Sequence, residues 1–335
     1  MATLPQIGIV YNPPLGKGEE FWASSADVLV QVEAVAESLE KLGYKPARIP
    51  FTRDLAAFLA TLRDLRVEMI FNLCETVDED PMLSGHPPAL FELLGIPYSG
   101  SPPQALILTT DKLLTKHLLK ANNIRTPNFL AYDGEAAFRP AGLKFPVIVK
   151  PNLQDASIGI DQESVFPDEH SLLRSIKDFY KQYGPLLVEE FIAGREFNIS
   201  VLGFPRAEAM PVAEIDFSDF PADMHRIVGY RAKWDEASFE FSHTPRRFPQ
   251  ESARDSFFES MQQIAVQCFQ LFGLRDYGRV DLRVDDRHQV HVLEVNANPC
   301  LSPDAGLAAA AANRGLSYVD LVEKLVQFLH ARTVG

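Results

Sequence analysis

The chain has 335 residues, of which 46% are hydrophobic and 23% are charged. This composition is typical of folded globular proteins and excludes a disordered or fibrous chain, and the length predicts two or three domains. The formal net charge of -13 would repel a polyphosphate backbone, and no run rich in Lys and Arg offsets it, so we expect no nucleic-acid partner.

The three cysteines, Cys74, Cys268 and Cys300, are far apart and show no C-x-x-C spacing, which argues against a disulfide framework and a zinc site. Residues 1–5 show no basic region followed by an apolar stretch. No segment approaches the roughly 18 apolar residues of a membrane span. We therefore expect a cytoplasmic protein without membrane contact.

The first hundred residues alternate between short apolar segments and segments with helical periodicity. Strands are predicted at 7–11, 48–51 and 68–71, and helices at 28–42, 55–65 and 88–94. Strands that alternate with helices usually form a parallel sheet. We expect a parallel α/β domain at residues 1–102, which ends at the turn-forming segment Gly100-Ser101-Pro102-Pro103.

The rest of the chain predicts two α+β domains, at residues 103–193 and 194–335. The first has predicted strands at 145–150 and 186–192, a helix near 172–183, and a helix to Asn122 capped by Thr110-Asp111. The second has predicted strands near 197–203, 208–215, 279–284 and 291–296, and helices near 256–272 and 318–330.

The last two predicted strands alternate between polar and apolar residues, and Asp285-Asp286-Arg287-His288 supplies a turn between them. In such a hairpin one face carries Arg279, Asp281, Glu294 and Asn296, and the other carries Val280, Leu282, Leu293 and Val295. Two facing carboxylates repel each other unless a cation lies between them, and carboxylates with an amide suit Mg²⁺. From these residues alone, a solvated face on which Arg279 neutralises the acids remains the alternative.

Lys150 ends a very apolar strand, where its ammonium group can be held against a phosphate. The loop that follows, residues 152–159, can place backbone N–H groups over phosphates. A surface lysine is the alternative reading of Lys150 alone.

Five ordered motifs resemble those of the ATP-grasp superfamily, and most closely its D-alanine-D-alanine ligase branch. They are Val147-Ile148-Val149-Lys150-Pro151, Val188-Glu189-Glu190-Phe191-Ile192 with Gly194 and Glu196, Arg231-Ala232-Lys233-Trp234, Gly278-Arg279-Val280-Asp281, and Leu293-Glu294-Val295-Asn296 with Asn298-Pro299. The similarity extends into the first domain through residues 93–101 and Asp111-Lys112-Leu113. It implies a three-lobed architecture, in which an N-terminal α/β lobe precedes two α+β lobes that clasp ATP.

The resemblance also implies a role for each matching residue. Lys112 and Lys150 contact the nucleotide phosphates, Lys233 approaches the transferred phosphate, and Ser157 lies in the loop over the phosphates. Glu189, Glu190 and Ile192 face the adenine, and Glu196 binds the ribose. Asp281, Glu294 and Asn296 bind Mg²⁺, with Mn²⁺ as an alternative, and Arg279 stabilises the oxyanion with a backbone N–H near Cys300.

By this resemblance we expect an ADP-forming ligase, in which a carboxylate takes a phosphate from ATP and an amine then displaces it. Because an acyl phosphate hydrolyses in water, residues 216–245 are expected to close as a lid. The expected partners are small carboxylate and amine substrates such as amino acids, and the family's habit of dimerising makes a homodimer an option.

The chain departs from this branch in the substrate-binding half of the site. The branch has a Ser in the phosphate loop and a Tyr in the lid, where this chain has Ala156 and Trp234. Cys300 and Asp304-Ala305-Gly306 occupy the region of a Ser-Leu pair that receives the second substrate's carboxylate, with Ser302 as a candidate substitute. Glu33 is a candidate for the acid that anchors the first amino group. We therefore expect altered substrates, with a true D-alanine-D-alanine ligase or an ATP-grasp phosphotransferase as alternatives.

Overall fold

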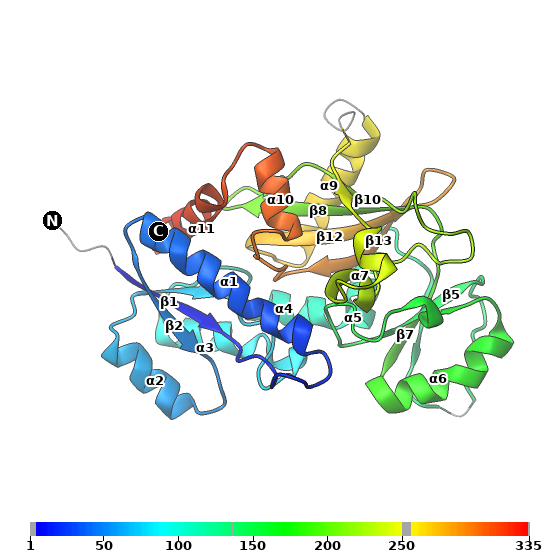
Figure 1. Ribbon diagram of the computed structural model, residues 1–335, viewed down its shortest axis with the longest axis horizontal. Helices are drawn as coiled ribbons and strands as arrows, with labels where there is room; N and C mark the ends of the chain where they lie inside the picture. The colour runs from blue at the N-terminus through cyan, green and yellow to red at the C-terminus, as the bar shows by residue number, and fades with distance from the viewer. Residues whose placement is uncertain (1–4, 136, 250–255, 334–335) are drawn as a thin grey trace.

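A computed structural model describes residues 5–135, 137–249 and 256–333, so the outermost ends of the first and third predicted domains lie outside the described residues. The described chain forms three sheets with helices packed on them (Figure 1), which confirms the predicted mixture of α/β and α+β lobes. Within these ranges, no helix combines the length and apolar character needed to cross a membrane.

The N-terminal sheet is parallel, with strand order β2-β1-β3. Its strands are β1 (Gln6–Tyr11), β2 (Lys45–Pro50) and β3 (Met69–Asn72), and they alternate with helices α1 (Trp22–Lys41), α2 (Leu55–Asp64) and α3 (His86–Leu94). The apolar strand residues are buried, which drives the helices onto both faces of the sheet. The predicted parallel lobe is therefore present.

The middle of the chain forms an antiparallel sheet with strand order β4-β7-β5-β6. Helices α4 (Pro103–Thr110) and α5 (Lys112–Ala121) precede the strands β4 (Phe129–Tyr132), β5 (Val147–Pro151), β6 (Val165–Phe166) and β7 (Leu186–Glu190), and α6 (Glu169–Tyr183) covers one face. Asp111 caps α5 as predicted, because its side chain accepts the backbone N–H of Leu114 at 2.9 Å. Helix α4 was not predicted, although Pro103 suits the first turn of a helix.

The C-terminal sheet is antiparallel, with strand order β11-β10-β8-β12-β13 and β9 paired to β8. Its strands are β8 (Arg195–Gly203), β9 (Glu208–Ala209), β10 (Ala213–Ile215), β11 (Arg246–Arg247), β12 (Asp276–Val284) and β13 (Val290–Asn296). Helix α9 (Ser256–Leu271) packs its apolar face on β8 and β12. The predicted lid holds two short helices, α7 (Tyr230–Trp234) and α8 (Phe239–Ser242).

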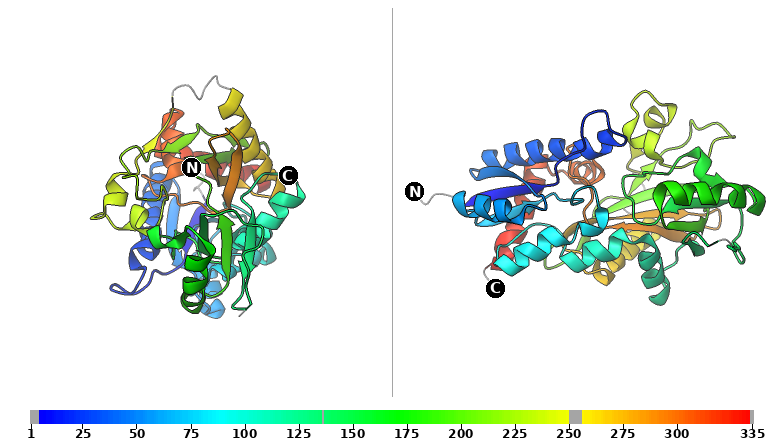
Figure 2. Two further views of the ribbon diagram at one scale, coloured as in Figure 1. Left: turned by 90° about the vertical axis from the view of Figure 1, so that its right-hand side faces the viewer. Right: turned by 90° about the horizontal axis from the view of Figure 1, so that it is seen from below.

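The last two helices share a core with the first lobe. Helices α10 (Gly306–Asn313) and α11 (Tyr318–Thr333) pack with α1, and Figure 2 shows α11 in red beside the blue N-terminal elements. Val32 and Val35 of α1 and Leu321 and Leu325 of α11 are at most 1% exposed and belong to one apolar cluster. The end of the third predicted domain is therefore packed on the first, and the predicted bounds of the three domains stay a prediction.

Candidate active site

A cavity of about 830 Å³ lies among the three sheets, and residues of each lobe line it. All the residues to which the resemblance assigns a contact with ATP, the metal ion or the oxyanion line this one cavity. These residues are Lys112, Lys150, Ser157, Glu189, Glu190, Ile192, Glu196, Lys233, Arg279, Asp281, Glu294 and Asn296. The fold thus brings together side chains from distant parts of the chain, while their individual roles stay predictions.

The predicted hairpin between β12 and β13 has the register that the alternation implied. Asp281 lies opposite Glu294, and Arg279 lies opposite Asn296. On the other side of β12, Asn198 of β8 lies opposite Asp281 and donates its side-chain N–H to Asp281 Oδ1 at 2.8 Å. Asn198 was missed by the sequence reasoning, and it fixes one oxygen of the carboxylate.

One residue of the hairpin departs from the predicted alternation. The register shifts by a β-bulge between Asp281 and Leu282, so Val292, and not Leu293, is buried in the core with Val295. Leu293 instead lines the cavity, so the prediction that it lies on the apolar face was wrong. A bulge adds one residue to a strand and turns the following side chains over.

Arg279 and Asp281 form a two-pronged ion pair on the cavity floor. Arg279 Nε and Nη2 donate to the two carboxylate oxygens at 2.8 and 2.9 Å, with side-chain exposures of 19% and 13%. The ion pair that the alternative reading predicts, in which Arg279 neutralises an acid, is therefore also present. Burial opposes ionisation of Glu294, but the nearby lysines and Arg279 outweigh burial and lower its pKa.

The residues of the hairpin fit a hard divalent cation by their chemistry. Asp281, Glu294 and Asn296 offer carboxylate and amide oxygens, which Mg²⁺ prefers. No group of three or more His, Cys, Asp or Glu side chains is arranged for a metal within the described ranges. The set is thus incomplete on its own, as expected for Mg²⁺ sites that are completed by water and by substrate phosphates.

Lys150 is held by a buried carboxylate that a second lysine shares. Glu189 Oε1 lies 2.6 Å from Lys150 Nζ, and Glu189 Oε2 lies 2.7 Å from Lys116 Nζ. Glu189 and Lys116 are each 1% exposed, and Lys116 Nζ also donates to Thr126 Oγ1 at 2.8 Å. The carboxylate of Glu189, predicted to face adenine, is therefore engaged by the two lysines.

The charges of this triad depend on one another. Burial would raise the pKa of Glu189, but Lys116 and Lys150 outweigh it and lower the pKa to about 2. Burial lowers the pKa of Lys116 to about 8, although the charge of Glu189 opposes this change. Glu189 thus stays ionised, and its charge holds Lys150 at the edge of the cavity.

The loop after Lys150 has an unusual backbone. Ala156 and Ser157 have φ of 54° and 61°, in the left-handed region that L residues seldom adopt. Lys112 donates to the backbone oxygen of Gln154, and its Nζ lies 3.5 Å from Asp155 Oδ1. Consecutive residues in turn conformations can point several N–H groups toward one anion, as predicted for this loop.

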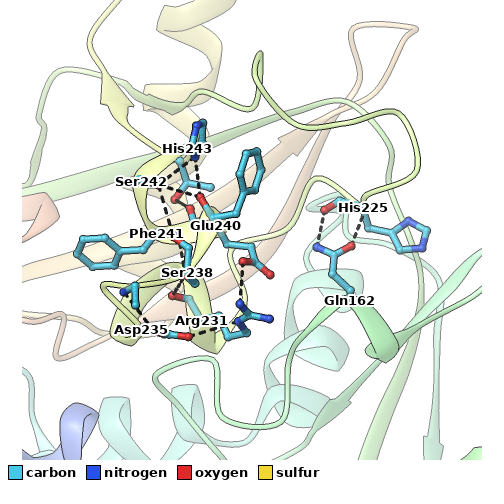
Figure 3. A network of polar contacts seen from close by, with 12 residues as sticks. Gln162, His225, Arg231, Asp235, Ser238, Glu240, Phe241, Ser242 and His243 are labelled. Atoms are coloured by element: carbon cyan, nitrogen blue, oxygen red, sulfur yellow. Dashed lines mark hydrogen bonds and ion pairs between the residues drawn. The ribbon is translucent and has the colours of Figure 1, made fainter.

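The predicted lid segment is docked on this loop at several points. Ser157 Oγ donates to the carbonyl oxygen of Val228 at 2.9 Å, and Trp234 Nε1 donates to the carbonyl oxygen of Ala156 at 2.9 Å. Gln162 makes two hydrogen bonds to the backbone of His225, at 2.9 and 2.7 Å (Figure 3). The segment therefore lies over the loop.

The lid has its own polar framework, which Figure 3 shows around α8. Arg231 forms ion pairs with Asp235 at 3.5 Å and with Glu240 at 3.6 Å. Ser238 caps α8 by accepting the backbone N–H of Phe241 at 3.1 Å. This framework presents Lys233 to the cavity, where burial and then the charge of Arg279 lower its pKa.

Glu196 and Ile192 are joined by Arg283, which the sequence reasoning missed. Arg283 Nε and Nη2 donate to Glu196 Oε2 at 3.1 and 2.8 Å, and Nη1 donates to the carbonyl oxygen of Ile192 at 2.8 Å. The carboxylate of Glu190 accepts the backbone N–H of Lys144 at 2.9 Å, so this side chain is also engaged by protein atoms. These contacts fix the segment that was predicted to bind the nucleoside.

The opposite end of the cavity carries acids of the N-terminal lobe. Asp27 accepts hydrogen bonds from Ser302 Oγ and from Cys300 Sγ, both at 2.9 Å. Gln31 Nε2 donates to Asp27 Oδ2 at 3.1 Å and to Glu75 Oε1 at 3.0 Å. Burial raises the pKa of Glu75 to about 7, and it raises the pKa of the Cys300 thiol well above its usual value. Cys300 is thus a hydrogen-bond donor and not a thiolate nucleophile.

Two predictions for this end of the site were wrong. Glu33 forms a two-pronged ion pair with Arg48 at 2.6 to 2.8 Å and does not line the cavity. Ser302 is 1% exposed and reaches Asp27 rather than the cavity. Asp27 and Gln31 are one helical turn apart on α1, a spacing that places both on one face and that could have identified Asp27.

Comparisons with known proteins agree with this architecture. Residues 131–327, more than half of the chain, match the family model described as "D-ala D-ala ligase C-terminus". The chain is 33% identical over 304 residues to a D-alanine--D-alanine ligase of Carboxydothermus hydrogenoformans, across 88% of this chain and 90% of that protein. It is 31% identical over 268 residues to an uncharacterized protein of Sinorhizobium fredii, across 80% of this chain and 76% of that protein.

The fold is similar to that of solved structures. The structure of a D-alanine--D-alanine ligase from Bacillus anthracis complexed with ATP superposes with a TM-score of 0.76 at 21% identity. The match covers 99% of this chain and 100% of that one. At this level of identity, the superposition supports the three-lobed fold alone.

Proposed function

This chain belongs to the D-alanine-D-alanine ligase family and is an ADP-forming, ATP-dependent carboxylate-amine ligase, and we propose that it joins two amino acids or amino-acid-like substrates other than a pair of D-alanines. The cavity supports this proposal because its two halves differ. The ATP half holds the lysines, the carboxylates and the amide that the family motifs require. In the substrate half, Ala156 and Trp234 replace the hydroxyl pair of the family branch, and Cys300 and Asp304-Ala305-Gly306 occupy the region of its Ser-Leu pair.

The reaction that we propose has two steps. A substrate carboxylate oxygen bonds to the γ-phosphorus of ATP, the bond to the β-phosphate oxygen breaks, and ADP leaves. The amine of the second substrate then attacks the acyl carbon, phosphate leaves, and an amide remains after the amine loses a proton. Negative charge accumulates in each step, and Lys150, Lys233 and Arg279 line the cavity where it would accumulate.

We further propose that Asp281, Glu294 and Asn296 hold Mg²⁺, with Mn²⁺ as a possible substitute. When bound, such an ion neutralises phosphate oxygens and orients them. The protein itself contributes the register of the hairpin, which sets the two carboxylates opposite each other, and Asn198, which orients one of them. Lys233 and Trp234 come from the lid, which we propose excludes water from the acyl phosphate.

The charges of the substrate half favour zwitterionic substrates. Asp27 and Glu75 suit an ammonium group, while Arg246, which also lines the cavity, suits a carboxylate. An amino acid carries both groups. The three cysteines form no disulfide, which is consistent with the reducing cytoplasm that we propose as the compartment.

Release of ADP from ATP and Mg²⁺ with pairs drawn from a panel of L- and D-amino acids tests this proposal. We expect ADP release that requires two particular amino acids, together with one dipeptide mass for each productive pair. Equal use of ATP with every pair, or a phosphorylated amino acid as the final product, contradicts ligation. D-alanyl-D-alanine as the preferred product contradicts the altered substrates alone.

A further inference from the structure

Arg246 and Arg247 are neighbours on strand β11, and their side chains leave the strand on opposite faces. Arg247 is 64% exposed and forms an ion pair with Asp216 outside the cavity. Arg246 lines the cavity instead. The short strand therefore places one arginine outside and one inside, although the two side chains are chemically identical.

Arg246 has donor groups that the protein does not use. Its Nη1 donates to the carbonyl oxygen of Asp304 at 3.2 Å. Its Nε is buried and has no hydrogen-bond partner within the described parts of the chain. The ion pairs of those parts include Arg247 and Arg279 but not Arg246. A buried donor without a partner is costly, and an anion in the cavity would satisfy it.

A second arginine lies close to Arg246. A Cβ atom placed on Gly306 would lie 3.7 Å from Arg246 Nη2 and 3.9 Å from Arg279 Cδ, so both side chains border this glycine. Burial, followed by the charge of Arg279, lowers the pKa of Arg246. Arg279 is already neutralised by Asp281, whereas no described carboxylate lies within ion-pair distance of Arg246, and the charges of Asp304 and Asp281 act on it only from farther away.

We propose that Arg246 binds a carboxylate of the amine substrate beside Gly306, and that this contact selects amine substrates with a free carboxylate. The inference rests on the proposed function, because it concerns the same cavity. A guanidinium group with free, converging N–H donors recognises a carboxylate better than a neutral amide. The carboxylate is either the α-carboxylate of an amino acid or one on its side chain.

Two matched variants test the role of Arg246. Arg246→Met removes the guanidinium from the cavity, and Arg247→Met removes the same group from the outer face of the same strand. With ADP release as the assay, we expect Arg246→Met to raise the KM for the amine substrate about ten- to a hundredfold, with little change in the KM for ATP. Arg247→Met should change both values less than twofold, and Arg246→Lys should recover part of the loss.

Pairs of substrates that differ in a single carboxylate identify which carboxylate Arg246 binds. Comparing an amino acid with its α-amide tests whether the α-carboxylate is bound. Comparing glutamate with glutamine, or aspartate with asparagine, tests whether the side-chain carboxylate is bound. The wild type should prefer the acid form in one of these comparisons, and Arg246→Met should abolish that preference. Equal use of both forms by the wild type overturns the inference, as does an equal loss of activity with acid and amide.

A binding measurement keeps this test separate from the test of the proposed function. If no pair of amino acids supports ADP release, the proposed function fails while the site of Arg246 can still be examined. Thermal unfolding with ADP, Mg²⁺ and glutamate, aspartate or glutarate should then show a stabilisation in the wild type and in Arg247→Met, but not in Arg246→Met. Absence of stabilisation in the wild type, or equal stabilisation in the two variants, overturns the inference.

Discussion

Trp234 donates its indole N–H to the carbonyl oxygen of Ala156 at 2.9 Å, so a side chain of the predicted lid holds the backbone of the predicted phosphate loop. The family branch that the sequence resembles uses a pair of hydroxyl groups at these two positions. A backbone acceptor requires no side chain, which explains how Ala156 can occupy the loop. The contact also supports the left-handed conformation of Ala156, with φ of 54°.

Replacing Trp234 by Phe should remove the hydrogen bond between the lid and the loop while keeping an aromatic ring at this position. One hydrogen bond is worth about 0.5–1.5 kcal/mol, so we expect about a two- to tenfold rise in ADP released without amide formation. Chromatography of ADP and amide from the same reaction measures this ratio. Trp22, the only other tryptophan, does not line the cavity, so Trp22→Phe should leave the ratio unchanged. An unchanged ratio in Trp234→Phe would show that the indole does not retain the acyl phosphate.

Replacing Lys116 by Met should destabilise the protein and weaken ATP binding. The change leaves the buried carboxylate of Glu189 with Lys150 as its remaining ion-pair partner, and loss of a buried partner costs about 3 kcal/mol. We expect a lower free energy of unfolding in urea and a higher KM for ATP. Lys120→Met on the exposed face of the same helix is the control and should lose only the contact of its ammonium group with the ring of Phe129, worth about 0.5–1 kcal/mol.

A double-mutant cycle separates this ion pair from other effects of the substitution. The double variant Lys116→Met/Glu189→Gln no longer contains the unpaired charge of Glu189. Its loss in free energy of unfolding should therefore be smaller than the sum of the losses of the two single variants, by more than about 1 kcal/mol. Additive free energies of unfolding would show that Lys116 does not act through Glu189.

Replacing Glu294 by Gln should impair the response to divalent metal. The change removes one of two facing carboxylates, and we expect kcat to fall on the order of a hundredfold and the Mg²⁺ concentration for half-maximal activity to rise. Titration of ADP release with Mg²⁺ and with Mn²⁺ measures both quantities. Asp286→Asn, in the exposed turn of the same hairpin, should leave the titration unchanged. A normal metal titration in Glu294→Gln would rule out this residue as a ligand.

Glu75 should make the stability of the protein dependent on pH. Its pKa is raised by burial from 4.5 to about 7, so the folded state binds this proton more tightly than the unfolded state. The resulting stabilisation is complete below pH 4.5 and is lost as the pH rises toward 7. Over that range, Glu75→Gln should gain about 3 kcal/mol in free energy of unfolding relative to the wild type, measured in urea without substrates. A constant difference between pH 4 and 8 would contradict the raised pKa.

The hairpin illustrates what the sequence could and could not predict. Alternation of polar and apolar residues placed Asp281 and Glu294 on one face correctly, because side chains alternate strictly in a regular strand. The same rule failed at Leu293, because a β-bulge leaves no mark in the pattern of apolar residues. Local periodicity thus predicts a strand but not its irregularities.

Residues that depend on distant partners were the hardest to predict. Lys116 occurs one helical turn after Lys112, a spacing that could have suggested a shared face, but its partner Glu189 comes from a later strand. Arg246 lies in a long polar stretch with no periodicity, and its position became evident only from the pairing of β11 with β10. Motifs predicted the residues that we propose to bind ATP, whereas Arg246 and Asn198 were found only from the fold.

The packing of α11 on α1 affects how the protein is made. The apolar face of α1, including Val32 and Val35, is buried against residues that are synthesised almost three hundred positions later. The first lobe therefore cannot bury this apolar face until the last helix has left the ribosome, and an exposed apolar face is prone to aggregate or to bind chaperones. Ribosome-bound chains that stop before Tyr318 should depend more on chaperones than chains that include the last helix.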